Sequence, residues 1–211
     1  YHAIATKQPG LLTRVGLGTF LDPRLEGGKM NRAAAEDLIE LMTIAGKEYL
    51  LYRTFPIHVA LIRGTTADER GNISMEREAV RLEALPLVCA ARASNGIVIV
   101  QVERMAASHT IPARQVELPG CLVDYVVVSE KPQECHRQSL QRVYSPAYCG
   151  EIRVPASNLV PLATGERRII ALRAASEIQE NAVVNLGSGI PEGVGVVLAE
   201  KGLSDSVYLS L

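Results

Sequence analysis

The chain has 211 residues, enough for one large domain or two small ones, and 47% of them are hydrophobic, which provides for a substantial core. Only 4% are aromatic and none is Trp, so this core must consist mainly of aliphatic side chains. The formal net charge of −1 argues against electrostatically driven binding to nucleic acid, and the lack of a long apolar run argues against a membrane span. We expect neither nucleic acid nor a membrane as a partner.

The four cysteines, Cys89, Cys121, Cys135 and Cys149, show no CxxC spacing. Cys135 and Cys149, even with His136, are too few and too irregular for a zinc site, so we expect no metal. We interpret the cysteines as free thiols in a reducing compartment. With no expected signal peptide, this interpretation predicts a cytoplasmic protein.

The first predicted element is a glycine-rich loop within residues 11–31. Gly16 and Gly18 flank a leucine, and Gly27 and Gly28 form a pair. Because glycine reaches backbone conformations that other residues avoid, this density of glycine predicts a structured loop. The loop is either a plain connector or a wall of a binding site.

Residues 33–41 are predicted to form a short helix. A turn at 45–47 then leads into a strand at 48–55, one arm of a hairpin. The continuous apolar run at 58–62 is typical of a buried parallel strand. The polar segment at 65–74 contains turn-forming Asp, Gly and Asn residues, so we expect a solvated turn there.

A helix is predicted over residues 76–93, with a kink or break just before Pro86. Two buried strands follow, at 97–102 and 123–128, and Glu103 at the end of the first is a minor candidate for a polar role in a site. Strands separated by helical stretches indicate an α/β fold, with open, mostly parallel sheets flanked by helices.

The character of the chain changes over residues 129–165, where four prolines break regular structure. We interpret this stretch as an interdomain linker. Residues 166–178 then predict an amphipathic helix. The side chains expected to face the core are those of Ile169, Ile170, Ala174 and Ile178.

Residues 183–200 predict a strand, a tight glycine turn and a helix. Asn185, Gly187 and Gly189 belong to the turn, and a proline suits the start of the helix. Free N–H groups at such a helix start suit a phosphate or a developing oxyanion, although many glycine turns bind nothing. A dinucleotide fingerprint is disfavoured, because Glu192 stands where its third glycine would fall.

Three blocks, in this order, resemble the family I CoA-transferases: GLGTFLDPRLEGGKMN (residues 16–31), ALIRGTTADERGNISMEREA (60–79) and RRIIALRAASEIQENAVVNLGSGIPEGV (167–194). The resemblance is closest to the single-chain acetate/propionate type, with the succinyl-CoA:3-ketoacid enzymes more distant. It implies two similar α/β halves with a phosphosugar-isomerase-like architecture. Residues 1–128 then correspond to the latter part of the first half, 129–165 to the interdomain connection and 166–211 to the start of the second.

The resemblance also implies a chemistry. In the family, a glutamate carboxylate attacks an acyl-CoA thioester, passes through an acyl anhydride and becomes a glutamyl-CoA thioester, from which a second carboxylate reclaims CoA. Coenzyme A is then a substrate, with a short-chain acyl-CoA and a free carboxylate such as acetate as reaction partners, and no permanently bound cofactor is expected. The implied site residues are Asn185, Gly187 and Gly189 around the acyl group or oxyanion, and Gly16, Gly18, Gly27 and Gly28 in the wall.

By the family's spacing, the nucleophilic glutamate follows the strand at 206–211, and no residue of the chain matches it. We therefore expect an internal fragment with both halves incomplete. Such a fragment would be inactive alone and would associate with the missing flanking segments in a homo-oligomer.

Two alternatives stay open. A phosphosugar isomerase or sugar-phosphate sensor shares the broader fold, but it favours a basic residue beside the glycine turn, where Asn185 and Glu192 stand. A non-catalytic binding or scaffold module would have kept the fold and lost the nucleophile. The residues after Leu211 would distinguish the transferase from the scaffold.

Overall fold

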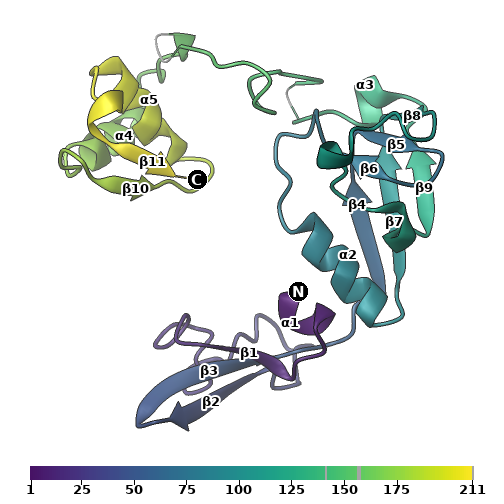
Figure 1. Cartoon of the computed structure of the whole chain (residues 1–211). Helices are drawn as coiled ribbons and strands as arrows, with labels where there is room; N and C mark the ends of the chain where they lie inside the picture. Colours follow the sequence, from purple (N-terminus) through teal and green to yellow (C-terminus); the bar gives the residue numbers. More distant parts are fainter. Residues whose placement is uncertain (141, 156–157, 211) are drawn as a thin grey trace. The chain divides into compact units, whose positions relative to one another are not determined.

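The computed structural model describes residues 1–140, 142–155 and 158–210, which belong to two compact units, Tyr1–Gly150 and Glu151–Leu211 (Figure 1). Both units combine strands with helices, which confirms the expected α/β class. The finer division into 1–128, 129–165 and 166–211 stays a prediction.

The first unit begins with a short helix and an antiparallel sheet. Helix α1 (His2–Ala5) precedes β1 (Gly10–Thr13), β2 (Ile39–Ile44) and β3 (Lys47–Arg53). The strands lie in the order β1-β3-β2. The β2–β3 pair is the predicted hairpin, whose turn lies at residues 45–46.

The helix predicted over residues 33–41 is wrong. Ile39 and Leu41 lie in β2, where they pair with Tyr52 and Leu50 of β3, and the residues before them form turns and bends. Ile39 and Leu50 are both buried. Burial between paired strands therefore outweighs the local preference for a helix.

A parallel sheet forms the centre of the first unit. Its order is β4-β7-β9, with β4 (Val59–Arg63), β7 (Ile97–Val102) and β9 (Tyr125–Val128), at the places where the sequence predicts strands. The predicted burial is wrong for β9, where each residue is exposed or half-buried, and holds for only one face of β4, where Leu61 is 73% exposed. Helix α2 (Ala84–Ala93) contacts β4 and β7. The core contains the fully buried side chains Ala60, Val88, Ala91, Val98, Val100 and Val102.

Helix α2 is shorter than predicted. Residues 76–83 are not helical, and Pro86 lies in the first turn of the helix. The first four N–H groups of a helix have no partner within it, so a proline there removes no hydrogen bond. The predicted break is therefore the start of the helix, which ends before Asn95 (φ +56°), as expected.

The solvated turn predicted at residues 65–74 is wrong. The segment contributes β5 (Thr66–Asp68) and β6 (Ile73–Ser74) to a small sheet in the order β6-β5-β8, with β8 (Arg104–Ala106). Thr65, Thr66 and Asp68 are buried. Their polar groups accept or donate hydrogen bonds within the unit, which makes their burial possible.

The remaining elements of the first unit are short. They are the single-turn 3₁₀ helices Ala113–Gln115 and Gly120–Leu122 and helix α3 (Pro132–Cys135). No helix in the described part of the chain is long and apolar enough to cross a membrane.

The second unit contains α4 (Glu166–Ala175), β10 (Val183–Asn185), α5 (Glu192–Glu200), a 3₁₀ turn at Ser204–Ser206 and β11 (Tyr208–Ser210). Strands β10 and β11 are parallel. The buried core consists of Ala171, Ala175, Val194, Val197, Leu198 and Val207.

The predicted core face of α4 is largely wrong. Ile169 is 67% exposed and Ile170 is 49% exposed, whereas Ala171 and Ala175 are buried, and Ala174 is exposed. A Cβ added at Gly193 of α5 would lie 3.2 Å from the Cβ of Ala171. Small residues thus allow α4 and α5 to approach closely, which turns the alanine face inward. Only Ile178, packed against the core, agrees with the prediction.

Candidate functional site

The predicted strand–turn–helix unit is present in the second unit, with β10, a turn at residues 186–191 and α5. Pro191 directly precedes the first helical residue, one position from the expected place. Asn185 pairs with Ser210 of β11, and the Leu186 N–H donates to the Ser210 carbonyl oxygen over 2.8 Å. The carboxyl ends of two parallel strands and a helix N-terminus therefore meet at this turn, which is where open α/β sheets bind ligands.

The backbone of this turn holds a carboxylate through the N–H of Gly189. Gly189 has φ +90°, and no heavy atom lies within 4 Å of the position of a Cβ there. Its N–H donates to the carboxylate of Glu192 over 2.9 Å. Asn185, Gly187 and Gly189 are exposed. The turn can thus hold a carboxylate oxygen on a backbone N–H, beside the positive end of the α5 dipole.

The glycine loop of the first unit is organised by a residue that the sequence reasoning missed. Asp22 is 1% exposed, and its carboxylate accepts hydrogen bonds from the Gly18 N–H (2.9 Å) and the Arg24 guanidinium (2.8 and 3.0 Å). The Arg24 side-chain bond, with the backbone bonds, holds the pKa of Asp22 far below its ordinary value. Arg24 also pairs with Glu48 of β3. Asp-Pro within a glycine-rich stretch was the available signal.

The structure brings the predicted residues together in two groups. Gly16, Gly18, Gly27 and Gly28 lie in the one loop, all with positive φ, and this loop belongs to the first unit. Asn185, Gly187 and Gly189 belong to the turn of the second unit.

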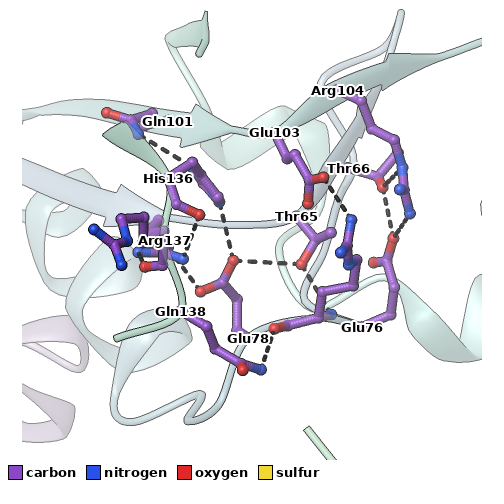
Figure 2. Close-up of polar contacts among 12 residues, drawn as sticks. Thr65, Thr66, Glu76, Glu78, Gln101, Glu103, Arg104, His136, Arg137 and Gln138 are labelled. Atoms are coloured by element: carbon purple, nitrogen blue, oxygen red, sulfur yellow. Dashed lines mark hydrogen bonds and ion pairs between the residues drawn. The ribbon is translucent and has the colours of Figure 1, made fainter. Parts of the chain in front are cut away.

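A partly buried polar cluster lies where β4 and β7 end in the first unit, and sequence reasoning did not find it (Figure 2). Arg63 pairs with Glu78 over 2.8 Å, and Arg77 pairs with Glu103 over 2.5 Å. His136, with a side chain 2% exposed, lies 3.1 Å from Glu78. Glu103, the minor candidate, is thus held in an ion pair.

The part of the cluster next to β5 and β6 contains Glu76. Burial raises the pKa of its carboxyl, but hydrogen bonds from Ser74 and Thr66, both 2.6 Å long, and from Arg104 outweigh burial and place the pKa below its ordinary value. Glu76 therefore stays ionised with all its partners inside the unit. This half of the cluster stabilises β5, β6 and β8 against one another.

Among residues 1–140, 142–155 and 158–210, no group of three or more His, Cys, Asp or Glu side chains is arranged to hold a metal ion. The four cysteines are free thiols.

Comparison with known proteins decides the family. Residues 1–129 match the family model described as coenzyme A transferase. The chain is 48% identical over 210 residues to a caffeate CoA-transferase from Acetobacterium woodii, a match that covers 100% of this chain and 40% of that protein. The chain belongs to the coenzyme A transferase family.

Other members of the family agree with the predicted resemblance. An acetate CoA-transferase, YdiF, from Escherichia coli K12 is 37% identical over 211 residues, which are 100% of this chain and 39% of that protein. A mitochondrial succinyl-CoA:3-ketoacid coenzyme A transferase 2B from Mus musculus is 30% identical over 217 residues, 99% of this chain and 37% of its own length. This order confirms the acetate type as nearer than the 3-ketoacid type.

The fold is confirmed by a crystal structure of the acyl-CoA transferase YdiF from E. coli O157:H7, described as a thioester complex with CoA. It superimposes with a TM-score of 0.87 at 36% identity and covers 99% of this chain and 41% of that chain. The chain therefore spans about 40% of the length of the curated CoA-transferases that it matches.

Proposed function

We propose that the protein containing these residues transfers CoA between a short-chain acyl-CoA and a free carboxylate such as acetate. The observation that carries the proposal is the turn at residues 186–191 at the carboxyl ends of β10 and β11, where the Gly189 N–H holds a carboxylate oxygen, in a chain related to CoA-transferases along its whole length. We further propose a cytoplasmic homo-oligomer without a permanently bound cofactor.

The reaction we propose needs no other reagent. A glutamate carboxylate attacks the acyl carbonyl, the C–S bond breaks and the CoA thiolate leaves, which forms a mixed anhydride. The thiolate then attacks the glutamyl carbonyl carbon of the anhydride, and the carboxylate of the original acyl group departs. The incoming carboxylate reverses both steps and regains the thioester, so atoms and electrons balance.

The nucleophile is proposed to follow β11. In the family pattern, a glutamate comes after this strand, and no glutamate of residues 1–211 occupies the matching position. Because β11 pairs in parallel with β10, its carboxyl end lies beside Asn185, so a residue that follows β11 would start from the rim of the turn.

In this proposal, Asn185, Gly187 and Gly189 form the acyl side of the site. The backbone N–H of Gly189, which accommodates the Glu192 carboxylate in the structure, would stabilise the negative oxygen of the tetrahedral intermediate. One such donor is typically worth about 3–4 kcal/mol in acyl transfer. Gly16, Gly18, Gly27 and Gly28 are proposed as part of the wall, in the loop that Asp22 orders.

A second substrate class has a specific observation in its favour. The caffeate CoA-transferase is 48% identical to this chain, against 37% for the acetate enzyme. An aromatic acid such as caffeate is therefore the alternative acceptor to acetate.

The test is CoA exchange by the product of the complete gene. Acetyl-CoA is supplied with propionate, or in parallel with caffeate, and the new acyl-CoA is separated by chromatography. We expect propionyl-CoA to form faster than caffeoyl-CoA, and the reverse order would favour the aromatic substrate class. Absence of transfer to any carboxylate would contradict the transferase and favour a scaffold, while turnover of a phosphosugar would favour the isomerase.

A further inference from the structure

The chain leaves β9 and passes over the end of the parallel sheet in the first unit. From the last residue of α3 onward, residues 135–138 lie against the carboxyl ends of β4 and β7 (Figure 2). In open α/β sheets, this end is the usual place for a ligand. In the first unit, residues 135–138 contact this end of the sheet, through hydrogen bonds between residues more than 30 positions apart.

The first set of contacts fixes the backbone of residues 135–137. Arg63, the last residue of β4, donates from its guanidinium to the carbonyl oxygens of His136 and Arg137, over 3.1 and 2.5 Å. Gln101 of β7 donates to the carbonyl oxygen of Cys135 over 3.1 Å. Three consecutive carbonyl groups are thus bound by side chains from two neighbouring strands.

The second set of contacts fixes the buried ring of His136. An ionised carboxylate only accepts hydrogen bonds, so the contact with Glu78 (3.1 Å) requires the proton on Nε2. The amide nitrogen of Gln101 lies 3.1 Å from Nδ1 and only donates, so Nδ1 accepts. Arg63 neutralises Glu78 on its other side. Both ring nitrogens of His136 therefore have a hydrogen-bond partner, in Glu78 and Gln101.

A third set lies around Gln138. Its amide nitrogen donates to the Arg77 carbonyl oxygen over 2.9 Å, and its amide oxygen accepts from the Ser145 N–H over 2.7 Å. The Arg77 guanidinium lies 3.9 Å from the centre of the Tyr144 ring. Residues 144–145 are thus attached to the same sheet end as residues 135–138.

We propose that residues 135–138 and 144–145 form a strap that closes the carboxyl end of the first parallel sheet, with His136 as its central plug. At the position where such a sheet would otherwise admit a ligand, the strap leaves a cavity of about 80 Å³, lined by Glu103, His136 and Tyr144 among other residues. The glycine turn of the second unit, in contrast, leaves open space around Gly189. The strap also keeps the chain up to residue 145 with the first unit. This inference does not depend on the proposed transfer reaction.

Hydrogen exchange measured by mass spectrometry on the product of the complete gene tests the strap. We expect Arg63→Met and His136→Phe to accelerate exchange of the peptide containing residues 135–138 by about tenfold or more, because each removes buried hydrogen bonds. Arg104→Met is the matched control, since Arg104 lies in the same cluster and its side chain bonds only Thr66 and Glu76 among the contacts described. It should leave that peptide unchanged.

Gln138→Ala is the milder variant should Arg63→Met or His136→Phe not fold. It removes the bonds to Arg77 and Ser145, and it should accelerate exchange around residue 145. Saturating acetyl-CoA should leave exchange of residues 135–138 unchanged in the unsubstituted protein. Unchanged exchange in the folded strap variants would overturn the strap. It would also be overturned if acetyl-CoA slowed exchange of residues 135–138 in the unsubstituted protein but no longer did so in His136→Phe.

Discussion

At the scale of single residues, Gly189 and Gly202 stand at opposite ends of α5 in matching environments. Both have positive φ, +90° and +68°, and neither has a heavy atom within 4 Å of the place of an added Cβ. Alanine at either position therefore introduces similar backbone strain, about 1–2 kcal/mol, without a clash. Only Gly189 belongs to the turn in which we propose the oxyanion donors.

Alanine at these two positions should therefore affect stability equally but activity differently. Gly189→Ala and Gly202→Ala should lower the free energy of unfolding by similar amounts in urea titrations. Gly189→Ala should in addition lower kcat/KM for CoA exchange roughly 10–100-fold, because a small displacement of a donor weakens transition-state binding. Equal kcat/KM in the two variants would contradict the role of the turn.

Asp68 predicts a dependence of stability on pH. Burial raises the pKa of its carboxyl, but bonds from Asn72 and from the Arg70 N–H, each 2.9 Å, outweigh burial, so the folded pKa lies below the unfolded one. The unfolded chain then binds the proton more readily, and stability from this group is present above the unfolded pKa and lost as pH falls through the folded pKa.

Urea unfolding of the first unit between pH 7 and pH 3 measures this loss. Asp68→Asn should unfold more easily at pH 7 and should show a flatter decline in stability on acidification. Asp205→Asn, an exposed carboxylate of the second unit, serves as the control and should keep the full decline of the first unit. A decline equally steep in Asp68→Asn would refute the assignment.

The residues of the glycine turn could be predicted because their neighbours in the chain decide their conformation. Asp68 and Asn72 were recognised as turn formers, but the burial of Asp68 was missed. It depends on a distant segment, in which the Gly120 N–H donates to the Asn72 side chain and Leu118 pairs with Ile73. Sequence spacing does not reveal such partners.

At the scale of elements, the contact of α2 with the parallel sheet holds the first unit together. Val88 of α2 is fully buried, whereas Val15 in the glycine loop is 75% exposed. Val88→Ala should therefore lower the free energy of unfolding by about 2–4 kcal/mol, from lost burial and the cavity left behind. Val15→Ala, the same chemical change, should stay within about 0.5 kcal/mol. Similar urea midpoints for the two variants would contradict this packing.

The strands with continuous apolar runs, β4 and β7, were predictable as strands, but their burial on both faces was not confirmed, since Leu61 of β4 is 73% exposed. The wrong predictions concern elements whose secondary structure or buried face depends on the elements that pack against them. Residues 39–44 became a strand because β3 offers a partner, and α4 turned its alanines inward because Gly193 admits a close approach. In both cases, the local pattern fitted a second structure equally well.

At the scale of the whole molecule, the family was predictable from three ordered blocks, since together they are far more specific than one glycine turn. The chain covers about 40% of its curated relatives, so the nucleophile of the proposed reaction was inferred and not seen. The glutamyl-CoA thioester is the intermediate that distinguishes the proposed reaction.

That intermediate can be trapped in the product of the complete gene. The enzyme is mixed with acetyl-CoA, quenched in acid and analysed by intact mass and peptide mapping. We predict a mass increase of one CoA less one water, on a glutamate that follows β11 in the sequence. Active transfer without this adduct, or an adduct on a residue within 1–211, would contradict a glutamate nucleophile after β11.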